Sequence, residues 1–491
     1  MKRIAACMLA LVMITQLLAG CSIEQENTVQ KTKEELFGES KNAFGNVTAP
    51  FDFDWKQCDG VVLDFLVENN INANILAREV DKFTEVTGIK VNIRSMDFDT
   101  MTKKLNMEFI SNTDQYELIY VDPYQTLCRF YEQLEDLNQY ENNPDIPNIV
   151  GGMESFSEQD RIVCSYFLND EKLCAVPFDT TTMLLYYRED IFEKYQEEME
   201  QDLGYPPNPG APSFTWQQYE EVSGWITEHV PEIAYGSITM SADHNSIYTE
   251  FSNLLSANGG DYFSDEGINS YGEKNAGRLM ADSPAFLEAL ARYKRLVDQN
   301  PEEVKALNWT EGADLFKEGK VAMMLNWDEN VPVVENEKES LASGKVGYGV
   351  LPYGTERSAN IYGGSGIGIN SNCSDVKKLA AWLFIVWATS PKLQIDAFLE
   401  EEGGNMPTRS NLNALITAQY MAQLPQALAA LTAHKKSYAY YRPKLEKGYE
   451  FENIIIMNLR KMLEEDLSAE ETAENMIREW EPFQPESQWE K

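Results

Sequence analysis

Polar side chains follow two predicted strands at the points where these strands end. The segment Glu68-Asn69-Asn70 comes directly after the apolar run 61–67, and Asp122-Pro123-Tyr124 comes directly after the apolar run 118–121. Short, nearly continuous apolar runs are typical of strands that helices cover on both faces. Ligands of such sheets bind beyond the carboxyl ends of the strands. Both polar segments are therefore placed where a ligand could be bound by carboxylate, amide and phenol groups.

A tryptophan beside two acidic residues marks a third position whose side chains could contact a ligand. Residues 317–330 read KEGKVAMMLNWDEN, in which Gly319 precedes an apolar run at 321–325. The length of this run and the preceding glycine predict a buried strand. Trp327 follows the run and is followed by Asp328 and Glu329. It either plugs the core at the end of this strand or stands at the mouth of a site.

Motifs for cofactor binding and nucleophilic catalysis do not occur in the sequence. The glycine-rich run 363–368 has the wrong order for a dinucleotide fingerprint, and there is neither a P-loop nor a G-x-S-x-G elbow. Three widely separated histidines and the lack of a C-x-x-C pattern indicate neither a metal centre nor a disulfide framework. Carboxylates are abundant, which leaves glycoside hydrolysis open, although no pair stands out. We expect no cofactor and no metal.

The composition excludes one large class of partners. The chain of 491 residues carries a formal charge of −38. Proteins that bind nucleic acids need an excess of Lys and Arg to neutralise phosphates, so nucleic-acid binding is not expected. The length predicts two or three domains.

The N-terminus predicts export and a lipid anchor. Lys2 and Arg3 precede an apolar stretch at 4–18, which is too short for a membrane span and typical of a signal peptide. It ends in Leu18-Ala19-Gly20-Cys21, which resembles the lipobox of bacterial lipoproteins. We expect a signal peptide at 1–20, lipidation of Cys21 and a polar tether at 21–55. The alternative is an ordinary signal peptide with an incidental cysteine.

The polar segments need a sheet to position them, and the sequence predicts one. After the strand at 61–67, apolar residues recur at helical spacing from Leu76 to Val86, and Gly88 precedes a second strand at 89–93. A helix at about 100–110 leads to the strand at 118–121. This alternation predicts an α/β fold with a mostly parallel sheet and helices on both faces. The second half is more helical, with predicted N-caps at Thr215, Ser283 and Ser468.

A colinear series of motifs from about Val61 to the C-terminus resembles a known family. In sequence order the motifs are FTEVTGIKVNI, YELIYVDPY, KLCAVPFDTTTMLLYYREDIFEKY, PSFTWQQYEEV, LLSANGGDYFSD, LFKEGKVAMMLNWDEN, GYGVLPYG, YGGSGIGINSNCSDVKKLAAWLF and GGNMPTRSNL. Together they resemble the extracellular solute-binding proteins of ABC importers, in the branch that carries oligosaccharides and related sugars. The resemblance covers some four-fifths of the chain.

The resemblance implies a two-lobed periplasmic-binding-protein-like fold of the class II type. Each lobe would hold a mostly parallel sheet flanked by helices, with the ligand cleft between the lobes. Residues 56–180 and about 365–424 would form the first lobe. Residues from about 181 to 364 and 425–491 would form the second, which ends in helices. Hinge motion could then close the lobes on a ligand.

The resemblance also implies a role. The protein would capture a carbohydrate without changing it and deliver it to ABC permease subunits at the outer face of the cell membrane. It would be a monomer and not an enzyme. Two alternatives remain: a surface-anchored glycan hydrolase, and a binding protein that serves a sensor.

The site residues implied by the family motifs come from several segments. Aromatic planes would cover the apolar faces of sugar rings, and polar side chains would bind the hydroxyls. Trp327 is then expected on the second-lobe wall of the cleft. The full set is Glu68, Asn69, Asp122, Tyr124, Asp179, Thr181, Asp261, Tyr262, Trp327, Asp328, Gly364, Ser365 and Arg409.

Overall fold

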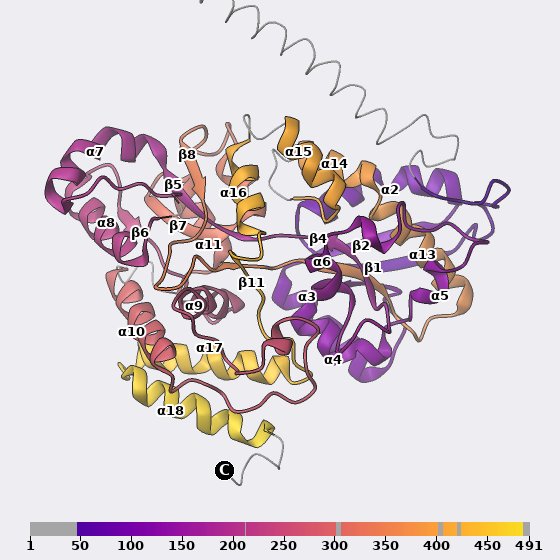
Figure 1. The fold of residues 1–491 in the computed structure, drawn as a ribbon. Helices are drawn as coiled ribbons and strands as arrows, with labels where there is room; N and C mark the ends of the chain where they lie inside the picture. Colours follow the sequence, from indigo (N-terminus) through magenta and orange to yellow (C-terminus); the bar gives the residue numbers. More distant parts are fainter. Residues whose placement is uncertain (1–46, 212, 301–305, 401–405, 420–423, 485–491) are drawn as a thin grey trace, which may run out of the picture.

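The computed structural model describes residues 47–211, 213–300, 306–400, 406–419 and 424–484, and this part of the chain forms two lobes (Figure 1). Each lobe is built around one sheet with helices packed against it. The predicted signal peptide, Cys21 and most of the predicted tether lie outside the described residues.

The first lobe contains a five-stranded sheet in the order β2-β1-β3-β10-β4. The strands pair in parallel from β2 to β1 and from β1 to β3, whereas β10 runs antiparallel to both of its neighbours. The strands are β1 (Val62–Glu68), β2 (Lys90–Met96), β3 (Leu118–Val121), β4 (Ala175–Asp179) and β10 (Ser365–Ile369). Because β1 and β3 are parallel and adjacent, their polar carboxyl ends lie at the same edge of the sheet.

The second lobe contains a four-stranded sheet in the order β6-β7-β5-β8. Here β5 runs antiparallel to β7 and β8, and only β6 and β7 are parallel. The strands are β5 (Met183–Arg188), β6 (Tyr235–Ser237), β7 (Val321–Trp327) and β8 (Val346–Gly349). The α/β fold class is thus confirmed, but the sheets are mixed instead of mostly parallel, because strands that enter each lobe by a crossing run against their neighbours.

Helices cover both sheets. In the first half of the chain they are α2 (Ile71–Thr87), α3 (Phe98–Ser111), α4 (Cys128–Phe130), α5 (Asn138–Glu141), α6 (Glu158–Ser165), α7 (Glu189–Leu203) and α8 (Trp216–His229). In the second half they are α9 (Asn245–Ala257), α10 (Pro284–Gln299), α11 (Trp309–Lys317), α12 (Val331–Val334), α13 (Asp375–Ala388), α14 (Pro391–Glu400), α15 (Ser410–Gln419), α16 (Pro425–Ala433), α17 (Gly448–Glu464) and α18 (Ala469–Trp480).

Local capping chemistry sets several helix ends, as the sequence predicts. Thr215 and Ser468 each accept a hydrogen bond from the backbone N–H three residues on, and the side chain at that position bonds back, so that α8 and α18 begin with complete capping boxes. Gly88 ends α2 with φ of 75°, a conformation that glycine adopts without steric cost. These ends depend on side chains within a few residues, which explains why the sequence reveals them.

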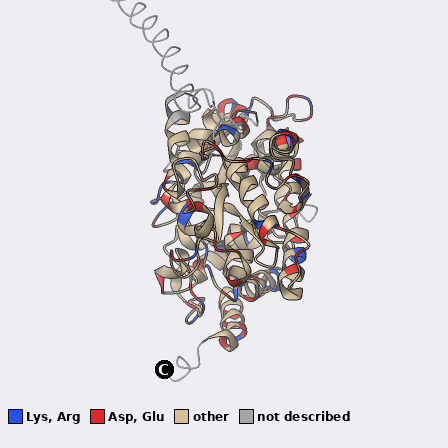
Figure 2. Ribbon diagram, turned by 90° about the vertical axis from the view of Figure 1, so that its right-hand side faces the viewer, with Lys and Arg blue, Asp and Glu red and all other residues tan. Residues whose placement is uncertain are grey.

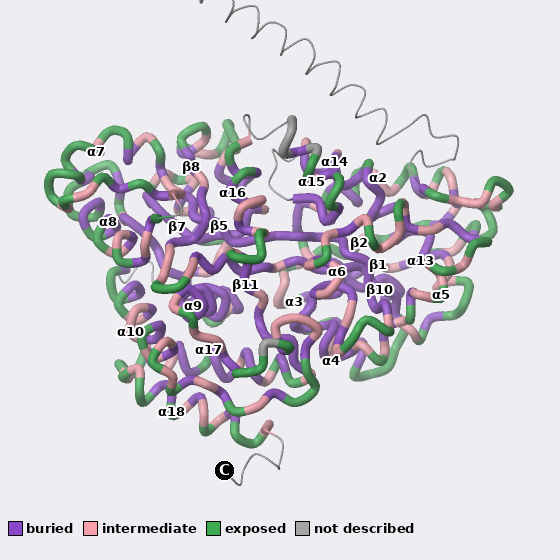
Figure 3. The backbone as a smooth tube through the Cα atoms, viewed as in Figure 1, coloured by how far each residue is buried: buried purple, intermediate pink, exposed green. Residues whose placement is uncertain are grey.

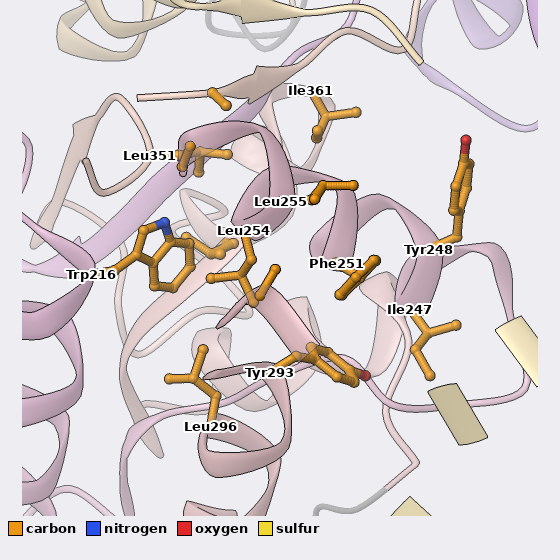
Figure 4. Packing of buried hydrophobic residues seen from close by; sticks show 14 of the residues in the cluster. Trp216, Ile247, Tyr248, Phe251, Leu254, Leu255, Tyr293, Leu296, Leu351 and Ile361 are labelled. Atoms are coloured by element: carbon orange, nitrogen blue, oxygen red, sulfur yellow. The ribbon is translucent and has the colours of Figure 1, made fainter. Parts of the chain in front are cut away.

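The cores of both lobes consist mainly of apolar side chains, many of which are aromatic. Trp382 and Trp387 of α13 are buried, and Trp382 donates from Nε1 to the carbonyl of Pro147 at 2.8 Å, so both tryptophans serve the structure. In the second lobe α9 is buried along its whole length. Figure 4 shows its residues Ile247, Tyr248, Phe251 and Leu254 among side chains of neighbouring elements. The inner strands β3, β4, β7 and β10 are buried along their whole length, which Figure 3 draws in purple, whereas the edge strand β2 is mostly exposed or half-buried.

Two of the segments that connect the lobes pair with each other. The N–H of Gly363 donates to the carbonyl of Thr181 at 2.9 Å, and Thr182 forms an antiparallel bridge with Tyr362. Beside them, the short strand β11 (Ala439–Tyr440) pairs with β9 (Asn360–Ile361). The crossings therefore form a compact joint beside the ends of β4, β7 and β10.

Charged residues lie mostly on the outer segments of the molecule (Figure 2). Among the helices of the described residues, none is long and apolar enough to span a bilayer.

Arg409 is an exception to this distribution, because its side chain is only 1% exposed. Its guanidinium donates to the carbonyls of Thr389 (2.9 Å) and Val150 (2.7 Å) and to Oγ of Ser155 (2.6 Å). It also covers the ring of Phe156 at 4.5 Å. Burial lowers the pKa of Arg409 to about 9. Arg409 thus fastens the end of α13 to the segment 150–156.

We predict that Arg409→Met lowers the free energy of unfolding by about 3 kcal/mol or more, because three buried acceptors lose their donors. Urea unfolding followed by circular dichroism measures this loss. Arg278→Met is the matched control, since Arg278 is half-exposed and its pair with Asp282 is of a kind worth about 0–1 kcal/mol. Equal stability of the two variants would contradict the role assigned to Arg409.

Candidate functional site

A cavity of about 350 Å³ lies where the carboxyl ends of β1, β3 and β7 face one another. Both lobes contribute to its wall. The first lobe supplies Glu68, Asn69, Asn70, Ile71, Asn74, Phe98 and Asp122, and the second supplies Asn245, Trp309, Thr310, Trp327, Glu329, Asn330, Pro332 and Val333. The crossings supply Thr181 and Gly363, and the segment after β11 supplies Arg442.

On the first-lobe side, the polar groups are held by helix caps. Asn70 is the N-cap of α2, where its Oδ1 accepts from the N–H of Ala73 at 2.9 Å while Nδ2 donates to Asp179 at 3.0 Å. Asp122 accepts from the backbone N–H groups of Tyr124 and Gln125 at 2.8 and 2.6 Å. Such caps fix the directions of these side chains. The wall is therefore rigid before any ligand arrives.

On the second-lobe side, two tryptophans meet edge to face. Trp327 ends β7 and is 5% exposed, and Trp309 begins α11 behind the capping box of Asn308 and Glu311. Their ring centroids lie 5.5 Å apart at an angle of 80°. The Nε1–H of Trp309 is buried without an acceptor among the described residues. Trp327 serves both alternatives that its sequence left open, since it packs in the core and also lines the cavity.

Three carboxyl groups in the cavity wall or directly behind it have raised pKa values. Desolvation, reinforced by Asp179 and Asp122, raises the pKa of Glu68 to about 8. Desolvation also raises the pKa of Glu329 well above its ordinary value, with Asp179, Glu68 and Asp328 adding to the effect. Asp328 accepts from Oγ1 of Thr181 at 2.5 Å and from N–H of Thr182 at 3.0 Å, yet burial raises its pKa to about 8.

Arg442 is the only cationic side chain in the cavity wall of the described residues. Its guanidinium lies over the ring of Tyr124 at 4.1 Å and donates to Oδ1 of Asn245 at 3.3 Å. Asn245 in turn donates to Glu452 at 2.7 Å. Arg442, Asn245 and Glu452 thus form a buried polar network that links the segment after β11 to α9 and α17.

The residues expected from the sequence divide into three groups. Glu68, Asn69, Asp122, Thr181 and Trp327 line the cavity. Tyr124, Asp179, Asp328, Gly364 and Ser365 lie close behind the wall or the crossings without lining it. Asp261, Tyr262 and Arg409 lie elsewhere.

The last group is used for structure. Asp261 accepts from the hydroxyl of Tyr440 at 2.8 Å and from Nδ2 of Asn269 at 3.1 Å. Tyr262 is fully buried in the second-lobe core, where it shares a hydrogen bond of 2.8 Å with Ser252. Arg409 binds the backbone carbonyls described above.

Several wall residues are missing from the set of site residues that the family motifs imply. They are Asn70, Ile71, Asn74, Phe98, Asn245, Trp309, Thr310, Glu329, Asn330, Pro332, Val333, Gly363 and Arg442. A signal exists for Trp309, because Asn308-x-x-Glu311 is a capping pattern that places the tryptophan at a helix start. No nearby sequence pattern indicates that Asn245 and Arg442 line the cavity. They reach it only because α9 packs against the segment that follows β11.

Comparison with known proteins places this geometry in a family context. The family model for bacterial extracellular solute-binding proteins matches residues 70–395. A probable ABC transporter-binding protein of Deinococcus radiodurans is 24% identical over 215 residues, which are 43% of this chain and 46% of that protein. The chain thus spans less than half of this relative's length.

Solved structures share the fold. Maltose-bound MalE3 of T. maritima has a TM-score of 0.71 at 23% identity, over 86% of this chain and 99% of that one. A solute-binding protein of Thermotoga lettingae bound to α-D-tagatose has a TM-score of 0.69 at 21% identity, over 86% and 100%. A substrate-binding protein of Listeria monocytogenes in complex with cycloalternan has a TM-score of 0.68 at 18% identity, over 86% and 99%.

Gly363 allows the crossing to pass against the Trp327 ring. A Cβ atom at this position would lie 2.6 Å from Cζ3 of Trp327 and 2.9 Å from Cγ2 of Thr181. We predict that Gly363→Ala lowers the free energy of unfolding by about 1–3 kcal/mol, because the indole must move. Urea unfolding measures the change.

Gly224→Ala is the matched control for this substitution. Its Cβ would meet no atom within 4 Å inside α8, so a gain of about 0.5–1 kcal/mol is expected. A Gly363→Ala protein as stable as the parent would show that the ring is not held by this contact.

Proposed function

The chain belongs to the bacterial extracellular solute-binding protein family, and from this premise we propose that it captures a carbohydrate between its lobes and delivers it to an ABC permease. The observation that carries the sugar assignment is the cavity wall, in which the Trp309 and Trp327 rings stand opposite the polar groups of Glu68, Asn69 and Asp122. Aromatic faces suit the C–H faces of sugar rings, and carboxylates and amides suit their hydroxyls.

We propose an oligosaccharide because the cavity continues on two sides. A hollow of about 250 Å³ shares Phe98 and Asn245 with it, and another of about 330 Å³ shares Thr310, Asn330, Pro332 and Val333. In this proposal the three adjoining hollows form one groove that holds successive sugar units. In this proposal the protein binds its ligand without cleaving it, as a monomer.

The division into lobes remains part of the proposal. Residues 56–180 with about 365–424, and about 181–364 with 425–491, would move as two bodies around the paired crossings. Rotation at Thr181 and Gly363 would change the distance between Glu68 and Trp327, which belong to opposite walls. Closure would then bring both walls onto the ligand.

We predict that calorimetric titration with maltose and a panel of longer oligosaccharides detects binding to at least one sugar. Trp309→Ala is expected to weaken that binding about five- to tenfold, since an aromatic contact is worth about 1 kcal/mol. Trp225→Phe is the control, because Trp225 is buried outside the cavity with its Nε1–H on Asp202 at 2.9 Å. Binding of a solute that is not a sugar, with no response to any glycan, would reject the carbohydrate assignment.

We also propose that Cys21 carries the lipid that holds the protein to the outer face of the cell membrane. The prediction is that cells given a radiolabelled fatty acid incorporate it into the wild-type protein. Cys21→Ser should abolish the label and release the protein into the medium or leave its signal peptide uncleaved. Cys58→Ser is the control, since Cys58 is a buried free thiol. Label retained on Cys21→Ser would disprove lipidation at this residue.

A further inference from the structure

The cavity holds more carboxyl groups than the recognition of neutral sugars requires. Glu68, Asp122 and Glu329 line it, and Asp179 and Asp328 lie directly behind. Hydrogen bonds from Asn70 and Thr181 connect the two rear carboxylates to the wall. Five carboxyl groups thus surround a space whose wall contains one cation among the described residues.

That cation is matched by other acids. Arg442 interacts electrostatically with Asp122 and Glu452, and its guanidinium lies between the rings of Tyr124 and Tyr248 at 4.1 and 5.6 Å. The charged groups that act on Glu329 are the carboxylates Asp179, Glu68 and Asp328. None of the described wall residues therefore offers a second cation that could balance Glu329 and Glu68.

Two oxygens on this side have no hydrogen-bond donor among the described residues. They are Oε2 of Glu329 and Oδ2 of Asp328, both shielded from solvent. Asp328 is fully buried. Buried acceptors without donors are costly, so an arrangement of this kind is stabilised when a ligand supplies the missing N–H groups. Because Glu329 lines the cavity whereas Asp328 lies behind it, Oε2 of Glu329 is the acceptor that such a ligand can reach.

Aromatic rings complete the pattern. Trp327, Trp309 and Phe98 line the same cavity as Glu329 and Glu68. The face of an indole ring attracts cations, and the attraction grows when water is excluded. Carboxylates together with aromatic faces form a recognised chemistry for organic ammonium groups. The described residues hold no cluster of His, Cys, Asp and Glu arranged to bind a metal ion.

We infer that the cavity is selective for a carbohydrate that carries a protonated amine, with the ammonium group between Glu68 and Glu329 and the sugar ring against the tryptophans. This inference rests on the proposed function and narrows its ligand class. The ammonium group would donate to Glu329 and Glu68 and neutralise charge that the protein leaves unbalanced. A neutral sugar would fill the same space but leave that charge in place.

The test compares sugars that differ only in the amine. Glucosamine and fully deacetylated chitin oligomers are titrated calorimetrically beside N-acetylglucosamine, glucose and the N-acetylated oligomers of equal length, all at pH 7. Amines are expected to bind at least tenfold more tightly than their neutral counterparts. Glu329→Gln should reduce this preference about tenfold, and Glu465→Gln, which removes an exposed acid far from the cavity, should leave it unchanged.

A second readout separates charge recognition from loss of structure. The ammonium group should expel a proton from Glu68 or Glu329, which face Asp97, Asp122, Asp179 and Asp328, so that the binding enthalpy varies with the ionisation enthalpy of the buffer. Neutral sugars should release no proton. Glu329→Gln removes a like charge and should raise the Tm of the ligand-free protein at pH 8, which also shows that the variant folds.

Each other outcome has a definite meaning. If neutral sugars bind as tightly as amines, the amine inference is overturned and the carbohydrate function stands. If no sugar of either kind binds, the carbohydrate function and the inference both fail. If spermidine binds and no sugar does, the inference fails because the ligand is then an amine without a sugar ring. Tighter binding of glucuronic acid than of glucosamine would also overturn it.

Discussion

The pairing of two chain crossings is the constraint on which the rest of the structure depends. Thr181 and Gly363 share a backbone hydrogen bond of 2.9 Å, and Asp160 of α6 fastens the same region by accepting from Oγ1 of Thr180 at 2.9 Å and from the hydroxyl of Tyr362. Asp160 is buried, and its pKa is raised by desolvation to about 6. The Asp160 carboxyl group, whether charged or neutral, thereby holds the two crossings together. Since each crossing continues into a strand, it also fixes the two sheets relative to each other.

The cavity is a consequence of that joint. Strands β4 and β5 diverge from it into different lobes, and β7 reaches it from the second sheet with Trp327 as its last residue. Gly363 leaves space for the Trp327 indole. The contact between these two residues therefore belongs both to the cavity wall and to the joint formed by the crossings. In the proposed closure, movement of the lobes would displace the Trp327 ring, so this residue could couple ligand binding to closure.

The electrostatics of the site oppose stability in the absence of a ligand. Desolvation raises the pKa values of Glu68, Glu329 and Asp328, and the neighbouring Asp179 carboxylate raises each of them further. Protons can relieve this repulsion, as can an incoming cation. With the proposed amine-bearing ligand, the same repulsion would become binding free energy, because the ligand would supply the missing charge. The hydrophobic cores of both lobes, with their buried tryptophans and tyrosines, supply the stability that this arrangement requires.

The sequence by itself determined the elements and their order. Apolar runs, capping boxes at Thr215 and Ser468, and the left-handed Gly88 act over a few residues, so each could be recognised locally. The motif series also indicated the family, and the polar ends of β1 and β3 were recognised as one edge of the sheet. The antiparallel strands could not be foreseen, because strand direction depends on which lobe a crossing enters.

Only the tertiary structure decided which side chains share the cavity. Arg442 and Asn245 are 197 residues apart and meet because α9 packs against the segment that follows β11. Asp261 and Arg409 resemble ligand residues in sequence but are turned to Tyr440 and to backbone carbonyls. The physical reason is that a periodic pattern encodes which face of an element is buried, whereas the partner across that face depends on contacts between segments far apart in the chain.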